Sequence, residues 1–456
     1  MLMTKSTRHK PRLSRFTFLL EEEGGLFLAY SSLTNGFMRL NKDLYEVLSS
    51  GDCEVLQEEA PEIYDQLRQQ HIIATEREDD DEVTKMEMQS NTGAYSTGMI
   101  GITLAPTVSC NLRCPYCFEA EKPAGLITEK TCDDVLDFIN SHVLCRSFSL
   151  NWFGGEPLLG IDRIGYFLDR LQERVEKKES VPMADHSMIT NATLLKGKAL
   201  DVFKKHPLNS VQITFDGDKE RHDRMKFHAD GKGTFDEILD NIEGFTEACP
   251  DTRIALRVNV DNNNFRDYLK LYNMFREKFN GKNIQFYPGI LRKCGDCDDE
   301  GFMTTADIAR FNKWLRDNGI EYSVYPRRMN KTCAATAIGA YAIGPHGEIY
   351  NCWEDMGQPE ALVGSIYKKA FDRPDMIANY MRYGTLFNDP ECRKCSVLPI
   401  CSGGCPKQRV ANRLDGAVNA ICSEYRDNDH AVLKQTLLDY YHSGRWKNKS
   451  CDKCPC

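Results

Sequence analysis

The sequence contains no long apolar run. Its 456 residues are 41% hydrophobic and 27% charged, and no stretch reaches the roughly 18 apolar residues that a membrane-spanning helix needs. The first ten residues are basic but lack the apolar core of a signal peptide. We therefore expect a cytoplasmic protein with no membrane partner.

An excess of positive charge is also absent. Lys and Arg number 58 against 67 Asp and Glu, which gives a net charge of −9. An acidic chain is not attracted to the phosphates of nucleic acid. Nucleic acid is therefore not an expected partner.

Cysteine, in contrast, is abundant, with 19 residues. Many stand in C-x2-C and C-x3-C runs, which indicate metal ligation in a reducing compartment rather than a disulfide framework. Four cysteines stand apart from these runs in helical contexts, and we expect them to be small buried apolar residues. They are Cys53, Cys132, Cys145 and Cys249.

Three cysteines with the spacing C-x3-C-x2-C directly follow a predicted strand at residues 100–104: Cys110, Cys114 and Cys117. A cubane iron–sulfur cluster normally takes four thiolates, so three would leave one iron open to a small molecule. The alternatives are a zinc knuckle or unrelated buried thiols, although zinc sites usually add a second cysteine pair or histidines. The spacing, with an aromatic residue before the last cysteine, resembles the signature of the radical S-adenosylmethionine (SAM) enzymes.

This resemblance implies a reaction and two cofactors. In that family SAM binds the open iron of a [4Fe–4S] cluster through its amino and carboxylate groups. An electron from the reduced cluster then cleaves SAM to a 5′-deoxyadenosyl radical. Cys110, Cys114 and Cys117 would be the ligands of that cluster.

A glycine pair followed by a carboxylate comes after the second predicted strand. Glycines let the backbone approach a ligand closely, and a carboxylate can accept hydrogen bonds from an ammonium group. By itself such a run is often only a turn. Downstream of the three cysteines it resembles the GGEP motif of radical SAM enzymes. The resemblance implies that the amino group of SAM is held by Gly154, Gly155, Glu156 and Pro157.

Weaker resemblances to SAM contacts occur at later strand ends. Thr190 and Asn191 end the third predicted strand, and Asp216 ends the fourth. Arg224 could contact the ribose or carboxylate of SAM. Strand-end capping for the first three residues and a surface charge for Arg224 are the alternatives.

A second array of seven ordered cysteines begins after residue 331 and resembles the SPASM domain. The resemblance implies two auxiliary [4Fe–4S] clusters, which makes three clusters in all. The outer cluster would be held by Cys392, Cys395, Cys401 and Cys422, and the inner cluster by Cys333, Cys352 and Cys405.

The fourth inner ligand stays open. Cys294, Cys297, a substrate cysteine or a thiolate of the tail could supply it, and the tail cysteines are Cys451, Cys454 and Cys456. Separate zinc or redox sites are the alternative at both places.

The apolar pattern predicts an α/β fold. Strand-like runs at 100–104, 148–153, 186–189, 210–215, 254–260 and 283–287 alternate with helical stretches, which implies a parallel sheet. Six units are too few for a closed eight-stranded barrel, so residues 98–290 should form a partial (β/α)6 TIM-like barrel. Its ligands should lie at the carboxyl ends of the strands.

The flanking regions should form two further domains. Strands at 16–20, 26–30 and 36–40, then helices at 42–49 and 60–69, predict a small α+β unit within residues 1–97, with an acidic linker from residue 76. This unit resembles the winged-helix element with which peptide maturases bind a leader as an added strand, although an unrelated cap or dimerisation element is the alternative. Residues 291–330, with a helix at 305–318, connect to a SPASM domain at 331–456, with a helix near 424–442.

These resemblances favour a maturase of a ribosomally made precursor peptide. We expect it to install a crosslink, with a thioether favoured, and to draw electrons from a flavodoxin- or ferredoxin-like reductant.

Formylglycine formation, as in anaerobic sulfatase maturases, is an alternative. Those enzymes place an Asp base directly after an inner-cluster cysteine, whereas Trp353 follows Cys352 here. Glu354 and Asp355 are the nearby candidate bases. A non-catalytic electron carrier is an alternative of another class, which the GGEP run disfavours.

Overall fold

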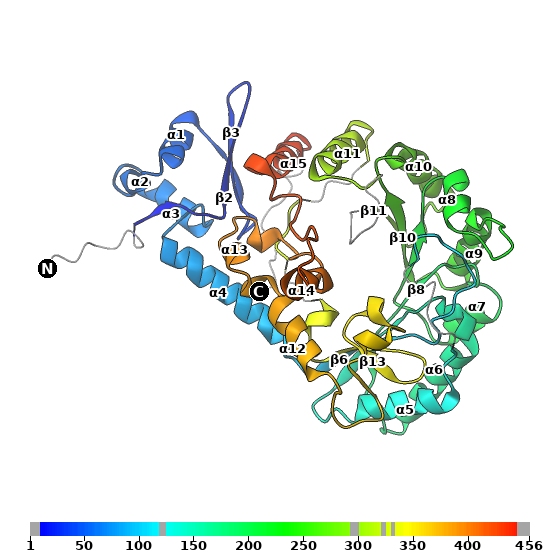
Figure 1. Ribbon diagram of the computed structural model, residues 1–456. Coiled ribbons are helices and arrows are strands. Elements are labelled where there is room, and N and C mark those ends of the chain that lie inside the picture. The colour runs from blue at the N-terminus through cyan, green and yellow to red at the C-terminus, as the bar shows by residue number, and fades with distance from the viewer. Residues whose placement is uncertain (1–9, 118–124, 292–300, 321–324, 330–332, 445–456) are drawn as a thin grey trace. The chain divides into compact units, whose positions relative to one another are not determined.

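The protein folds into two compact units. The structure is a computed structural model that describes residues 10–117, 125–291, 301–320, 325–329 and 333–444 (Figure 1). Unit 1 comprises Met1–Gly93, Thr305–Thr332 and Thr385–Cys456, and unit 2 comprises Ala94–Thr304 and Cys333–Gly384. The predicted domain boundaries stay a prediction, and the two units divide the chain differently.

Unit 2 is built on a parallel sheet, as the sequence predicts. Six parallel strands lie in chain order across it. They are β6 (Met99–Leu104), β7 (Ser147–Trp152), β8 (Met183–Thr190), β9 (Ser210–Phe215), β10 (Arg253–Val260) and β11 (Ile284–Ile290). Because β11 forms one edge, the sheet is open, as expected for a partial barrel.

Helices between these strands cover one face of the curved sheet (Figure 1). They are α5 (Glu129–Asn140), α6 (Ile161–Glu176), α7 (Lys198–Lys205), α8 (Lys219–Met225), α9 (Phe235–Ala248) and α10 (Tyr268–Lys278). In α6, Ile164, Phe167, Leu168 and Leu171 are buried, at the i, i+3, i+4, i+7 spacing of one helical face. The α/β alternation therefore follows directly from the apolar periodicity.

The chain extends this sheet after unit 1 has contributed α11 (Thr305–Asp317). Strand β12 (Ala340–Ile343) pairs in parallel with β6, and β13 (Glu348–Tyr350) and β14 (Gly364–Ser365) add antiparallel strands. Helix α12 (Pro374–Tyr383) follows. Cys333 and Cys352 therefore flank the β12–β13 hairpin on the same sheet as the predicted SAM site.

Unit 1 contains the three predicted N-terminal strands as an antiparallel sheet. Its order is β2 (Thr17–Glu22), β3 (Leu26–Ser31), β4 (Phe37–Leu40), and β1 (Arg12–Leu13) pairs separately with β5 (Ile73–Ala74). The accompanying helices are α1 (Lys42–Ser50), α2 (Glu54–Glu59) and α3 (Pro61–Gln69). The predicted strands and helices of this region are confirmed.

The two faces of β3 serve two different cores, because successive side chains of a strand point to opposite sides. Phe27 and Ala29 pack toward α1–α3. Leu28 and Tyr30 pack toward α15 (Ala431–His442) and toward Val397 and Ile400 in the cysteine-rich segment. The first and last parts of the sequence therefore share one core. The predicted helix near 424–442 begins at Ala431 rather than residue 424.

The acidic stretch predicted as a linker is instead the 19-residue helix α4 (Glu76–Ala94). Asp79 in its first turn is fully buried and accepts hydrogen bonds from Ser14 Oγ (2.7 Å) and Arg15 N (3.1 Å), with His71 Nε2 at 2.9 Å. Charge density alone suggested a solvated segment. These tertiary contacts of one carboxylate explain why that prediction was wrong.

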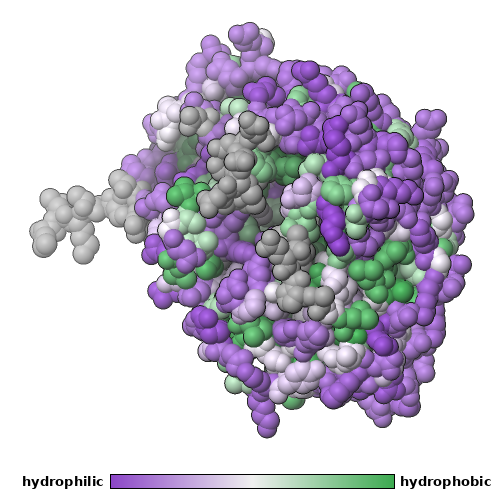
Figure 2. All heavy atoms as spheres, turned by 45° about the vertical axis from the view of Figure 1, so that its right-hand side comes forward, coloured by the Kyte–Doolittle hydropathy of each residue, from purple (hydrophilic) through white to green (hydrophobic). Residues whose placement is uncertain are grey.

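One face of the molecule is mainly polar. The face in Figure 2 is largely hydrophilic with scattered hydrophobic groups, as a chain with 27% charged residues leads one to expect. Within the ranges that the structure describes, we find no helix with the length and apolar character required to cross a bilayer.

Asp79 provides a test of how α4 is anchored. Asp79→Asn should lower the free energy of unfolding of unit 1 by about 1–3 kcal/mol, because a buried amide cannot accept all of these hydrogen bonds. Asp80→Asn is the matched control, because Asp80 is half exposed and forms a surface pair with Arg15, worth about 0–1 kcal/mol. Urea unfolding measures both, and equal effects would contradict the anchoring role.

The same carboxylate predicts a pH dependence. Burial raises the pKa of Asp79, but the hydrogen bonds from His71, Ser14 and Arg15 outweigh burial and hold that pKa below its usual value. Its contribution to stability should therefore be present at pH 7 and be lost as the pH falls below about 4. The difference between wild type and Asp79→Asn, measured by urea unfolding at several pH values, should shrink in that range. A constant difference would contradict the account.

Candidate functional site

The predicted SAM-site residues gather at the carboxyl ends of β6, β7, β8 and β9. The three-cysteine loop follows β6, the glycine pair follows β7, and polar residues end β8 and β9. All of them belong to unit 2. Parallel strands bring these four loops to one edge of the sheet.

The glycine pair is packed directly against the backbone of the cysteine loop. Gly155 N donates to Thr107 O (3.2 Å), and Glu156 N donates to Ser109 O (2.9 Å). A Cβ on Gly154 would lie within 3.0 Å of Thr107 O, and one on Gly155 would lie equally close to Ser109 O. Gly154 also has a positive φ of 111°. The glycines are therefore required for the approach of two backbone segments.

Glu156 joins the end of β7 to the end of β8. Its side chain is fully buried. Oε1 accepts from Leu158 N (3.0 Å) and Thr190 Oγ1 (2.7 Å), and Oε2 accepts from Asn191 N (2.8 Å). Burial raises its pKa to about 6, against the opposing effect of these donors. Glu156 thus links the two strand ends through internal hydrogen bonds, and its contact with SAM stays a prediction.

Asn191 reaches from β8 to the cysteine loop. Its Nδ2 donates to Asn111 Oδ1 (3.0 Å) and lies 3.7 Å from Cys110 Sγ. Leu112 N also donates to Cys110 Sγ, at 3.4 Å. Two N–H groups are therefore directed at the first cysteine sulfur, which favours a negatively charged thiolate there.

The three cysteine side chains fit thiolate ligation by a cluster. All three are partly buried, and none forms a disulfide. Burial raises the pKa of Cys110 to about 11 and that of Cys114 to about 12, so a bound metal would have to displace both protons. In the described part of the chain, no three His, Cys, Asp or Glu side chains are grouped as a single metal ion requires. The cluster assignment stays a prediction.

Asp216 is the centre of a buried ionic network. Its Oδ2 accepts from Tyr116 OH (2.7 Å) and lies 3.3 Å from Lys226 Nζ, and its Oδ1 accepts from Asn259 Nδ2 (2.8 Å). Burial raises the pKa of Asp216, but Lys226 together with the two hydrogen bonds holds it below its ordinary value. Asp216 thus anchors the cysteine loop through Tyr116, and its contact with SAM stays a prediction.

Arg224 forms an exposed pair with Glu220 on the surface of α8, at 2.6 Å. Its contact with SAM stays a prediction. Arg221, one helical turn earlier, instead donates to Asp216 O (3.0 Å) and to Asp261 Oδ2 (2.5 Å). The sequence analysis missed Arg221, Tyr116 and Lys226. A helix predicted directly after Asp216 would have put Arg221 in its first turn, close to Asp216.

The candidate bases lie beside the same strand ends. Trp353 stacks on Phe153, with ring centroids 5.4 Å apart, and Phe153 directly precedes Gly154. Asp355 is buried and accepts from Tyr380 OH (3.2 Å). Ala105 and Val108 of the cysteine loop share a core with Met356. The segment after Cys352 is therefore adjacent to the cysteine loop.

Four cysteines of the second array line one small cavity of unit 1. They are the predicted outer-cluster ligands Cys392, Cys395, Cys401 and Cys422. The loop between the last two contains Gly403 and Gly404, both with positive φ, and a Cβ on Gly404 would meet Ile421 O. These glycines let the loop approach the chain just before Cys422.

The remaining predicted ligands are distributed more widely. Asn351 Nδ2 donates to Ala335 O (3.4 Å), which brings together the segments that carry Cys352 and Cys333. Cys405 belongs to unit 1. Cys294, Cys297 and the three tail cysteines lie outside the described residues. The four cysteines predicted to be buried are confirmed as such.

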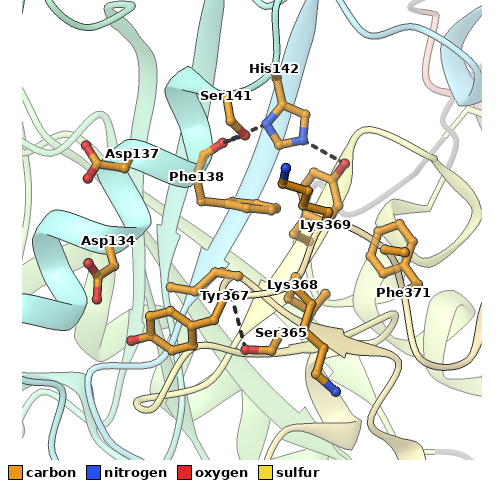
Figure 3. Close-up of a pocket in the computed structure, with 14 residues that line it drawn as sticks. Asp134, Asp137, Phe138, Ser141, His142, Ser365, Tyr367, Lys368, Lys369 and Phe371 are labelled. Carbon is orange, nitrogen blue, oxygen red and sulfur yellow. Dashed lines mark hydrogen bonds between the residues drawn. The ribbon is translucent and has the colours of Figure 1, made fainter.

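A cavity of about 570 Å³ lies elsewhere in unit 2. Its lining comes from α5, β12 and residues 365–371 (Figure 3). His142 bridges Phe138 O (2.8 Å) and Tyr341 OH (3.0 Å) there. No residue predicted for the site lines it, and its contacts show how the added strands pack against α5.

Comparisons with known proteins identify one domain of the chain. Residues 104–289 match the radical SAM superfamily. The chain carries a radical SAM domain and is a radical SAM enzyme. The matched segment runs from the end of β6 to β11 and contains the three cysteines and the glycine pair. The electron-carrier alternative is therefore not supported.

Several relatives match a larger part of this radical SAM enzyme. The serine-type anaerobic sulfatase-maturating enzyme of Bacteroides thetaiotaomicron is 23% identical over 364 residues, which is 69% of this chain and 85% of the relative. The cysteine-type enzyme of Clostridium novyi is 25% identical over 70% of this chain and 91% of its own. The radical SAM cyclopropyl synthase TigE of Paramaledivibacter caminithermalis is 20% identical over 86% of this chain and 89% of its own.

Solved structures agree with the fold. The sulfatase-maturase structure anSMEcpe with bound AdoMet and the Cp18Cys peptide superimposes with a TM-score of 0.55 at 20% identity, over 77% of this chain and all of that one. SuiB of Streptococcus suis covers 90% of this chain and 99% of its own, with a TM-score of 0.50 at 17% identity. These likenesses concern the fold alone.

Two arginines on one helix provide a test of the site. Arg221→Ala should lower stability by about 1–3 kcal/mol and weaken SAM binding, because it leaves the buried Asp261 without its charged partner. Arg224→Ala, three residues later in α8, is the matched control and should change either quantity by no more than about 1 kcal/mol. Urea unfolding and equilibrium dialysis of SAM measure the pair. A larger loss of SAM binding in Arg224→Ala than in Arg221→Ala would support the predicted contact of Arg224 with SAM.

The glycine contact provides a second test. Gly155→Ala should strip iron from the three-cysteine loop, because the added methyl group meets the Ser109 carbonyl and overpacking costs about 1–3 kcal/mol. Gly244→Ala, at a position in α9 where a Cβ meets nothing within 4 Å, is the control. The measurement is the iron content of both variants after anaerobic reconstitution. Full iron content in Gly155→Ala would contradict the packing argument.

Proposed function

We propose that this radical SAM enzyme modifies a peptide, and that it is a maturase that installs a crosslink in a ribosomally made precursor. The observation that carries the proposal is the pairing of a SAM-type cysteine loop with a second cysteine array and an N-terminal α+β region in one chain. The match to TigE takes in 86% of the chain, whereas the sulfatase-maturase matches take in 69% and 70%. The additional coverage shows that a radical SAM relative other than a sulfatase-maturating enzyme matches more of this chain.

Cys110, Cys114 and Cys117 would hold the SAM-binding [4Fe–4S] cluster, and SAM would occupy the fourth position. Bound there, the cluster and SAM would supply the radical chemistry that removes hydrogen from a peptide carbon. The protein positions the three thiolates through the contacts of the glycine turn and Asn191. We assign the run from Gly154 to Pro157 to the amino group of SAM, because Glu156 Oε2 accepts one hydrogen bond and a carboxylate oxygen can accept two.

The auxiliary cluster sites would handle the excess electron. Cys392, Cys395, Cys401 and Cys422 would hold the outer [4Fe–4S] cluster, and their gathering on one cavity supports this assignment. Cys333, Cys352 and Cys405 would hold an inner cluster. Its fourth position would be open to a substrate thiolate, and for this reason we favour a thioether product.

The leader of the precursor would bind unit 1. The strand order β2-β3-β4 leaves β2 and β4 at the edges of the sheet, and an extended peptide can add to such an edge. The anSMEcpe structure is a complex with the Cp18Cys peptide, which supports a peptide as the substrate class. A flavodoxin- or ferredoxin-like protein would supply the electrons.

Formylglycine formation is the second candidate, because two of the relatives are sulfatase-maturating enzymes. It needs a base beside the oxidised carbon. Asp355 would be that base, since it lies in the segment next to the cysteine loop and is oriented by Tyr380. The two reactions differ in product. Both are two-electron oxidations, but only a crosslink joins two residues of the peptide.

The reaction class is tested by anaerobic reconstitution with iron and sulfide, followed by SAM, dithionite and a candidate precursor containing cysteine. We expect 5′-deoxyadenosine and a peptide lighter by two hydrogens, with fragmentation blocked between the crosslinked residues. The Cys110/Cys114/Cys117→Ala triple variant should form neither product. An aldehyde at a single residue would support the sulfatase-type reaction. The same mass loss in a precursor without cysteine would exclude a thioether.

A further inference from the structure

The cavity lined by the four outer-cluster cysteines also contains two arginines, Arg409 and Arg426. Arg409 lies on α14 (Pro406–Leu414), and its Nη2 donates to Cys392 Sγ at 3.2 Å. Arg426 follows Cys422, and its Nη1 donates to Cys422 Sγ at 3.4 Å. Two of the four sulfurs therefore accept a hydrogen bond from a guanidinium group.

Arg409 is fixed from several sides. Its side chain is only 5% exposed. Its Nε donates to Gly403 O, between Cys401 and Cys405, and its Nη1 lies 3.2 Å from Asp389 Oδ2. Asp389 in turn caps α13 (Pro390–Arg393) by accepting from Cys392 N (3.3 Å). The guanidinium is thus held against the sulfur by groups on both sides of the cavity.

Arg426 is held less firmly. Its side chain is 39% exposed, and its Nη2 lies 3.9 Å from Glu391 Oε2. A charge near solvent is screened by water and salt, whereas a buried charge is screened much less. The two arginines therefore make the same kind of contact in two different dielectric environments.

We propose that Arg409 and Arg426 set the reduction potential of the outer auxiliary cluster, with Arg409 the stronger of the two. The inference rests on the proposed function, because it presumes that the four cysteines hold a cluster. Uptake of one electron adds one negative charge to a thiolate-bound cluster. Positive charge and hydrogen bonds at the sulfurs stabilise that reduced state and so raise the potential. Both arginines are positioning residues and touch no substrate.

A role limited to folding makes a different prediction. If Arg409 only anchored the Cys401–Cys405 segment to Asp389, its replacement would lower stability or iron content. The reduction potential of the clusters that remain would not change. If it acts on the cluster, the potential moves while the iron is retained. The reduction potential therefore separates the two roles.

The experiment follows the outer cluster in the full-length, reconstituted chain. All variants also carry Cys110/Cys114/Cys117→Ala, which removes the proposed SAM cluster. The reduction step (below, the outer wave) that disappears when Cys395→Ala is added belongs to the outer cluster. Its midpoint is measured by EPR-monitored titration with dithionite in Arg409→Gln, Arg409→Lys and Arg426→Gln. Arg413→Gln, an exposed position on the same helix, is the matched control.

We expect the outer wave to move to a more negative potential in Arg409→Gln and by less in Arg426→Gln. Arg409→Lys should recover part of the shift because it restores the charge, and Arg413→Gln should leave the wave unchanged. Added salt should reduce the effect of Arg426→Gln but not that of Arg409→Gln.

An Arg409→Gln protein with full iron and the control's potential would overturn the inference while leaving the proposed function intact. If Arg409→Gln loses the outer-cluster iron, the test falls to Arg426→Gln. An unchanged midpoint potential of the outer cluster in Arg426→Gln overturns the inference. If Cys395→Ala removes no wave, the outer cluster itself is wrongly assigned, which is a failure of the proposed function.

Discussion

The close contact between the glycine turn after β7 and the cysteine loop after β6 is the constraint on which the site depends. Two backbone hydrogen bonds, from Gly155 to Thr107 and from Glu156 to Ser109, hold the loops together. A side chain at either glycine would separate them. Glu156 and Asn191 extend the same connection to β8. These contacts hold the cysteine loop at a fixed place on the sheet.

A second constraint joins the two ends of the sequence within unit 1. Both faces of β3 are buried, and one of them packs on α15 and on the segment that carries Cys395. Val83 and Met86 of α4 pack with Leu398 in the same region. The sheet proposed to bind a leader and the cysteines proposed to hold the outer cluster are therefore parts of one packed body.

The sequence predicted most of the fold because the apolar periodicity of its strands and helices is strong. All six parallel strands and the N-terminal sheet were identifiable in this way. Helix α4 was not, because its acidic residues look solvated unless one knows that Asp79 meets Ser14 and His71. The extension of the main sheet by β12–β14 also depends on long-range pairing that no local pattern encodes.

The site was predictable to the level of its loops but not of its side chains. Motif spacing located the cysteines and the glycine pair. It could not distinguish Arg221 from Arg224, since only the direction of α8 decides which of them meets Asp216. It also could not show that Glu156 and Asp216 are buried and hydrogen-bonded within the protein, and their contacts with SAM stay predictions.

The account's central claim is that the loop held by the glycine turn binds a cluster with one iron open to SAM. The most direct test is the EPR spectrum of the dithionite-reduced protein before and after addition of SAM, compared with the Cys114→Ser variant. We predict that SAM changes the spectrum of one cluster in the wild type and has no effect on the variant. A wild-type spectrum that SAM leaves unchanged, in protein with fully loaded clusters, would contradict the account.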